Sequence, residues 1–262
     1  MPRFAANLSL MFTEVPFLDR FEAAARAGFE AVEFLFPYAF SLDDLHIRLK
    51  RFGLELVLFN LPPGHWDEGE RGITALKGRE AEFSLGLNLA LKYAEALGCQ
   101  RLHAMSGLCQ HGADEEVYYA NLHLAAEWAK DLGKTIVIEP INTYDLPGYF
   151  LSTTEQASAI IKNIGVTNLM LQFDMYHHFR MGGNVIEALK IYAPIISHYQ
   201  CAHPLDRSEP WHDVLNYAEV FSSIDATGYD GWVGCEYKPK RGTLEGLGWM
   251  NPWRDQKTCQ QK

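Results

Sequence analysis

The segment Lys134-Thr-Ile-Val-Ile-Glu139 is a short, largely apolar run that ends on a carboxylate. Three later segments have the same form: Leu169-Met-Leu-Gln-Phe-Asp174, Ile195-Ile-Ser-His-Tyr-Gln200 and Trp232-Val-Gly-Cys-Glu236. Each is typical of a buried strand that closes on an oxygen donor. The four donors lie 35, 26 and 36 residues apart, enough each time for a loop, a helix and the next strand. If the strands are parallel, all four side chains lie at the carboxyl-terminal face of a barrel, where active sites are built.

The first half of the chain repeats this alternation of apolar runs and amphipathic segments. Ser41 with Asp44 is expected to begin one helix, and Gly53 to end it. Eight strands are predicted, at residues 4–9, 31–36, 54–59, 101–105, 134–138, 169–173, 195–199 and 232–235. Helices are predicted at 17–26, 41–52, 79–97, 114–132, 153–162, 183–192 and 212–227.

Eight strand–helix units predict an α/β fold, a single (β/α)8 TIM barrel. One domain is expected over residues 1–262, with residues 254–262 as a polar, frayed tail. An open doubly wound sheet would alternate in the same way. That fold would need a Gly-rich phosphate turn after the first strand, and Asn7-Leu-Ser-Leu-Met has none.

Charge and composition narrow the class of protein. The chain has 23 basic and 33 acidic residues, a formal charge of −10, and no Lys/Arg cluster that could follow a phosphate backbone, so nucleic acid is not an expected partner. No apolar run reaches the ~20 residues of a membrane span, and no signal peptide is recognisable. Five cysteines without a CxxC pair indicate a reducing compartment, and we expect a cytoplasmic protein.

Three carboxylates and one amide oxygen form an all-oxygen set, which suits Mg²⁺ or Mn²⁺ better than Zn²⁺. Such a cation would polarise the carbonyl of a 2-hydroxy carbonyl compound and stabilise an enediolate. Glu139 and Glu236, from strands on different sides of the mouth, would then remove and deliver the proton. For any one of these residues a helix cap is the ordinary explanation, and Asp174 could cap a following turn.

Other polar residues allow two interpretations. His103, on the fourth predicted strand, either faces the pocket or is a hydrogen-bonded core residue. The long loop after the third strand carries His65 and Arg71, which could clamp an acid group or be ordinary solvated loop residues.

Three motifs carry a family resemblance: Ile138-Glu-Pro-Ile-Asn142, Phe173-Asp-Met-Tyr-His177 and Gly234-Cys-Glu-Tyr-Lys-Pro239. With the segment from Gly69 to Glu80, they resemble the hydroxypyruvate isomerase family of the xylose isomerase-like barrels, nearly end to end. The resemblance implies an isomerase of hydroxypyruvate or 2-oxo-tetronate, small hydroxy-oxo acids, without a nucleotide cofactor. It also implies that barrels pair through helical faces into a homo-oligomer.

By position, the resemblance implies a divalent metal held by Glu139, Asp174, Gln200 and Glu236, with Glu139 and Glu236 as the catalytic pair. It further implies that His177 holds a substrate oxygen. Arg207 would hold a substrate carboxylate.

The chain departs from the family pattern after Gln200, where Cys201-Ala-His203-Pro follows, and at Trp211-His212. Both departures are expected to border the substrate and to make the pocket narrower or different in polarity.

Three other functions use the same fold or site. A ketose 3-epimerase would use the same carboxylates, but related epimerases usually carry His where Gln200 stands. A metal-dependent phosphodiesterase acting on damaged DNA would need several His ligands and a basic groove, and neither is visible in the sequence. A noncatalytic sugar-acid sensor would be expected to have lost one carboxylate or the metal set, and all of these residues are present.

Overall fold

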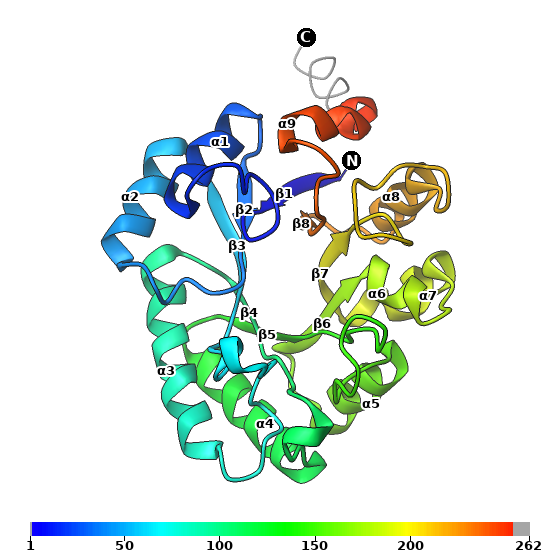
Figure 1. The fold of residues 1–262 in the computed structure, drawn as a ribbon. Helices are drawn as coiled ribbons and strands as arrows, with labels where there is room; N and C mark the ends of the chain where they lie inside the picture. Colours follow the sequence, from blue (N-terminus) through cyan, green and yellow to red (C-terminus); the bar gives the residue numbers. More distant parts are fainter. Residues whose placement is uncertain (1, 254–262) are drawn as a thin grey trace.

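A computed structural model describes residues 2–253, so the expected polar tail at 254–262 lies outside the described residues. Eight parallel strands close into a barrel in chain order, with β8 pairing back to β1 (Figure 1). The strands are β1 (Arg3–Asn7), β2 (Ala31–Glu33), β3 (Glu55–Asn60), β4 (Arg101–His103), β5 (Thr135–Ile138), β6 (Leu169–Asp174), β7 (Ile196–Cys201) and β8 (Trp232–Cys235). The predicted (β/α)8 barrel is confirmed.

Helices surround the strands as an outer ring (Figure 1). They are α1 (Arg20–Arg26), α2 (Leu42–Phe52), α3 (Glu80–Leu97), α4 (Glu115–Asp131), α5 (Thr154–Ile164), α6 (Met175–Arg180), α7 (Val185–Tyr192), α8 (Tyr217–Ala226) and α9 (Thr243–Gly246). Among residues 2–253, no helix has both the length and the hydropathy needed to cross a bilayer.

Local sequence signals explain where several helices begin and end. The Ser41 hydroxyl accepts from the Asp44 N–H at the start of α2, and Gly53 takes the left-handed conformation at its end, both as predicted. Asp114 caps α4 in the same way by accepting from the Val117 N–H. These caps satisfy backbone groups that the helix itself leaves unpaired.

The helices differ from the prediction at three places: α6, the start of α8, and α9. The segment after β6 forms the extra helix α6, which the sequence pattern did not predict because it spans only six residues. The helix expected to start at residue 212 starts at Tyr217, because the Asn216 side chain caps it by accepting from the Glu219 N–H. After β8, α9 and the 3-10 turn Leu247–Met250 lie between α8 and α1, in the place of an eighth barrel helix (Figure 1).

The side chains inside the barrel change from apolar to polar along its axis. A small apolar cluster that includes Ala5, Ala31, Val57 and Val137 fills the amino-terminal part. Buried polar side chains occupy the carboxyl-terminal part: Asn7, Glu33, Asn60, His103, Gln172, His198 and Gln200. Because buried polar groups are costly unless they are paired, this end of the barrel indicates a functional site.

Candidate active site

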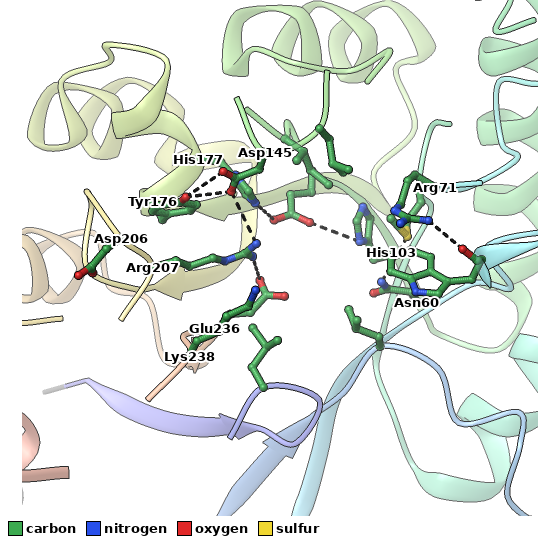
Figure 2. A pocket seen from close by; sticks show the side chains of 17 residues that line it. Asn60, Arg71, His103, Asp145, Tyr176, His177, Asp206, Arg207, Glu236 and Lys238 are labelled. Atoms are coloured by element: carbon green, nitrogen blue, oxygen red, sulfur yellow. Dashed lines mark hydrogen bonds and ion pairs between the residues drawn. The ribbon is translucent and has the colours of Figure 1, made fainter. Parts of the chain in front are cut away.

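A cavity of about 530 Å³ opens at the carboxyl ends of the strands (Figure 2). Its polar wall contains carboxylates, imidazoles and cationic side chains, namely Asn60, Arg71, His103, Glu139, Asp145, Tyr176, His177, Asp206, Arg207, Glu236 and Lys238. Position and lining match those of an enzyme active site in a parallel barrel.

Three of the predicted carboxylates gather here from different strands. Glu139 directly follows β5, Asp174 ends β6 and Glu236 directly follows β8, and all three are at most 7% exposed. One oxygen of each, Glu139 Oε1, Asp174 Oδ2 and Glu236 Oε2, is buried without a hydrogen-bond donor among residues 2–253. Buried carboxylate oxygens without donors require a cation or a proton.

The carboxylates also raise one another's proton affinity. Burial raises the pKa of Asp174 to about 6 against the opposing effect of Arg207, and raises that of Glu236 to about 8. Burial, followed by repulsion from Glu236 and Asp174, raises the pKa of Glu139. Atoms of Glu139, Asp174 and His177 lie within 4.8 Å of one another, and the two carboxylates of this cluster fit a divalent metal.

Gln200 lies deeper in the barrel than the other predicted ligands. Its Nε2 donates to Glu33 Oε1 at 2.8 Å, and its Oε1 accepts from Gln172 Nε2 at 2.7 Å. It lines a separate void of about 10 Å³, together with Glu139 and Glu236. Gln200 is therefore next to two of the predicted ligands, but its amide is already engaged on both sides.

The position of His177 is fixed by a hydrogen bond to its Nδ1. Asn142 Oδ1 accepts from the backbone N–H groups of Tyr144 and Asp145, so its amide nitrogen must point the other way. That nitrogen lies 2.6 Å from His177 Nδ1 and donates to it. Burial lowers the pKa of His177 and keeps the ring neutral, so the single ring proton is on Nε2.

His177 Nε2 faces the carboxylates, 3.6 Å from Asp174 Oδ2 and 3.9 Å from Glu139 Oε1. A nitrogen that carries the proton is a hydrogen-bond donor and offers no lone pair to a metal. His177 is thus suited to donate to an oxygen atom in the cavity.

Arg207 reaches the carboxylates from the loop after β7. Its Nη2 lies 3.3 Å from Glu236 Oε2 and 3.7 Å from Asp174 Oδ2. Its φ of 56° is in the left-handed region, which costs a residue with a Cβ free energy and occurs most often at functional sites. Two backbone hydrogen bonds maintain this conformation, from the Arg207 N–H to His203 and from the Lys238 N–H to Arg207.

The structure also places the remaining sequence candidates. His103 is 1% exposed, and its Nδ1 lies 3.5 Å from Glu139 Oε2, so it faces the site. Burial lowers its pKa to about 3, which keeps it neutral. Arg71 lines the cavity on the side opposite Arg207 (Figure 2).

The expectation that Trp211 and His212 narrow the pocket is wrong. Neither residue lines the cavity: Trp211 is 44% exposed, and the His212 ring packs against Trp253 with centroids 5.6 Å apart. The buried carboxylate of Glu209, just before these two residues, accepts from the Lys240 N–H and ties this loop to the segment after β8.

Glu33 is a functional candidate that the sequence analysis missed. It ends β2 inside the barrel and is fully buried. Asn7 Nδ2 donates to its Oε1 at 3.0 Å, and His198 Nε2 lies 2.6 Å from its Oε2. A Cβ at Gly234 would lie 2.3 Å from that same Oε2, so glycine leaves the space that the carboxylate fills. The prediction passed over Glu33 because the apolar run continues through Phe34-Leu-Phe36, which placed this carboxylate inside the predicted strand 31–36 and not at its end.

Comparisons with known proteins agree with this geometry. The model of the family described as "Xylose isomerase-like TIM barrel" matches residues 21–253. The chain is 49% identical to "2-oxo-tetronate isomerase" of Cupriavidus necator, covering 97% of this chain and 99% of the relative. It is 43% identical to "Hydroxypyruvate isomerase" of Escherichia coli, covering 97% and 100%.

A solved structure from Brucella melitensis, described as an AP endonuclease of family 2, is 47% identical and has a TM-score of 0.94. The match covers 97% of this chain and 100% of that one. Sequence, fold and site therefore agree that this chain belongs to the xylose isomerase-like TIM barrel family, in the group of the hydroxypyruvate and 2-oxo-tetronate isomerases.

Proposed function

We propose that this protein is an isomerase of a small hydroxy-oxo acid, either hydroxypyruvate or 2-oxo-tetronate, that moves a carbonyl group to the neighbouring carbon. One observation carries the proposal: three buried carboxylates from separate strands, each with an oxygen that lacks a donor, surround a cavity that also contains cationic groups for an acid. The relatives named above support the same class of reaction.

Proton transfer is assigned to Glu139 and Glu236. For hydroxypyruvate, one carboxylate removes a proton from the hydroxymethyl carbon, which gives an enediolate, and the other delivers a proton to the adjacent carbon. Because the two groups come from β5 and β8, they approach the substrate from different sides of the mouth. The hydroxyl proton moves between the two substrate oxygens, and His177 Nε2–H is placed to hold one of them.

A divalent cation, Mg²⁺ or Mn²⁺, is assigned to Glu139, Asp174 and Glu236, with Gln200 below them as the fourth predicted ligand. When bound, it supplies the positive charge that stabilises a developing enediolate. The oxygens without hydrogen-bond donors support this assignment. Arg207 contacts a substrate oxygen near these groups, while its charge is shared with Asp174 and Glu236.

The phosphodiesterase alternative is disfavoured by the residues of the site. The one cluster of potential metal ligands within residues 2–253 contains a single histidine, and that ring is held as a donor by Asn142. A formal charge of −10 is unfavourable for a nucleic-acid substrate.

A cytoplasmic location is also part of the proposal. The four cysteines within the described residues are all free, as expected in a reducing compartment. Fractionation of the producing cells with a specific antibody tests this, and protein found outside the cytoplasm would contradict it.

Proton NMR of hydroxypyruvate in D₂O tests the activity, with and without Mg²⁺ or Mn²⁺. We expect tartronate semialdehyde that carries solvent deuterium, and loss of both product and exchange in Glu236→Gln. Glu127→Gln is the matched control, since that carboxylate is exposed on α4. Inversion at C3 of 2-oxo-tetronate, with exchange at that carbon and without carbonyl movement, would indicate a 3-epimerase instead. If metal-loaded, folded protein gives neither product nor exchange with hydroxypyruvate or 2-oxo-tetronate, the proposal is refuted.

A further inference from the structure

Arg71 presents a fixed guanidinium to the cavity. It lies in the loop between β3 and α3, with its Cζ 4.1 Å from the centroid of the Trp66 ring. Its Nη1 donates to the carbonyl oxygens of Trp66 at 3.0 Å and Glu70 at 2.6 Å. Nε and Nη2 donate to no residue within the described chain. These two nitrogens form the edge of the guanidinium that matches a carboxylate in bidentate geometry.

The charge of Arg71 is available to an incoming acid, unlike that of Arg207. Arg207 is shared among Asp174, Glu236 and Asp145. Arg71 forms no ion pair with any carboxylate between residues 2 and 253. Lys238 also lines the cavity, but its side chain is exposed and its ammonium is a freely rotating point charge. Arg71 is therefore the pre-oriented cation of this wall.

The neighbouring carboxylate of Glu70 would neutralise Arg71 if it were free to turn. It is held on Arg79 instead, with Arg79 Nη1 2.6 Å from Glu70 Oε1 and Nη2 3.3 Å from Oε2. The His65 N–H donates to Glu70 Oε2 at 2.6 Å. Glu82 holds Arg79 from the other side, 2.7 Å from its Nε.

Two glycines in this loop, Gly64 and Gly72, leave the space that the arrangement needs. Gly64 has a φ of +81°, and a Cβ there would lie 2.1 Å from Glu70 Oε2. Gly72 has a φ of +102°, and a Cβ there would lie 2.3 Å from the Met105 carbonyl oxygen. The loop is thus seated tightly on the end of β4, and the Glu70 carboxylate has a space prepared for it.

We propose that Arg79 is a positioning residue that holds the Glu70 carboxylate away from Arg71, so that Arg71 binds the carboxylate of the substrate. The inference rests on the proposed function for the nature of the substrate. It assigns a role to the Gly69-Glu-Arg-Gly72 and Arg79 segment, which the proton-transfer chemistry does not use.

The test compares Arg79→Met with the double variant Glu70→Gln/Arg79→Met. Arg79→Met frees Glu70 to pair with Arg71, so we expect KM for the hydroxy-oxo acid to rise about tenfold, with kcat changed less than about twofold. The double variant removes the competing charge and should return KM to within about threefold of the wild type. Arg79→Lys, which can still pair with Glu70, should lie between them. Arg26→Met, which removes an exposed Arg–Glu pair on α1, is the matched control.

Calorimetric binding of glycerate to Mg²⁺-loaded protein gives a readout that does not depend on turnover, since glycerate has no carbonyl and cannot isomerise. Its Kd should follow the same order as KM, whereas glycerol, which lacks the carboxylate, should show no difference between variants. An unchanged KM and Kd in Arg79→Met, or an equal rise in the double variant, overturns the proposal.

The two proposals fail in distinguishable ways. If the wild type and the variants bind glycerate in the expected order of Kd, but the wild type isomerises no hydroxy-oxo acid, the proposed function is refuted and the role of Arg79 is supported. A wild type that binds no glycerate would overturn the role of Arg71 as an acid anchor.

Discussion

At the scale of the residue, the position of one ring proton determines whether His177 Nε2 is a hydrogen-bond donor or an acceptor. Asn142 is fixed by two backbone N–H groups, and its amide nitrogen in turn fixes the imidazole with Nε2 as the donor. The sequence shows a histidine three residues after Asp174 but gives no sign of its tautomer, because the determining residue is 35 positions away. Such a contact between the loop after β5 and helix α6 becomes visible only in three dimensions.

Asn142→Asp tests this relation. An aspartate keeps an oxygen for the Tyr144 and Asp145 N–H groups, but it places an acceptor on Nδ1, so the ring proton moves there. We expect kcat to fall by at least about tenfold, since Nε2 can no longer donate, while thermal unfolding changes little. Nitrogen-15 NMR of the labelled ring measures the tautomer directly. A variant with the proton on Nδ1 and full activity would contradict the role of His177.

At the scale of single elements, strand ends determine the site. β5, β6 and β8 each close on a carboxylate, and the apolar runs before them were sufficient to predict both the strands and these residues. Both loop candidates, Arg71 and Arg207, were named from the sequence, but what orients them was not visible there. Arg71 is held by the carbonyl oxygens of Trp66 and Glu70, and Arg207 by its positive φ and by the N–H of Lys238. Glu33 was missed because only the structure shows that its strand ends at residue 33 and not at residue 36. The loop that carries Trp211 is tied by Glu209 to Lys240, 31 positions away, and no pattern in the sequence indicates that contact.

Asp174 serves as a helix cap and as a site carboxylate at once. Its Oδ1 accepts from the Tyr176 N–H at 2.8 Å, while Oδ2 has no hydrogen-bond donor within residues 2–253. We therefore expect Asp174→Asn to preserve the cap and lose cation binding, whereas Asp174→Ala loses both. The free energy of unfolding of the two metal-free variants should differ by about 1 kcal/mol in favour of Asn. Denaturant titrations and Mn²⁺ titrations measure the two effects separately, and equal stability of the two variants would argue against the cap.

Gly234 and Glu33 form a matched pair across the strands β8 and β2. A methyl group at Gly234 would meet the Glu33 carboxylate, so Gly234→Ala should destabilise the fold by about 1–3 kcal/mol. In a Glu33→Ala background the same substitution should cost less, because the carboxylate is absent. A double-mutant cycle from chemical denaturation gives the coupling, and strictly additive effects would exclude it.

At the scale of the whole molecule, charge is concentrated in one cavity of a strongly acidic chain. Each of the three buried carboxylates has one oxygen that accepts no hydrogen bond from residues 2–253. Together they carry more negative charge than the single guanidinium of Arg207 balances, so they weaken the fold unless a further cation is bound. Mg²⁺ or Mn²⁺ at 100 times its Kd is therefore expected to stabilise the protein by about 2.7 kcal/mol. The measurement is thermal unfolding after chelation and after readdition of metal, with Glu139→Gln as a variant expected to lose the increment. A melting temperature that does not depend on the metal would exclude the site.

The pairing of β8 with β1 has a consequence for the order in which the chain can fold. The strand β1, near residue 3, has a second neighbour only once β8, near residue 232, has been synthesised and has paired with it. A nascent chain that ends at Gly231 leaves β1 and β7 as open sheet edges, each with a row of unpaired backbone groups. We expect that truncated chain to aggregate on expression, and a soluble monomer from it would show that the open sheet is stable. Closure of the barrel during synthesis thus depends on the last strand, which is also the strand that Glu236 directly follows.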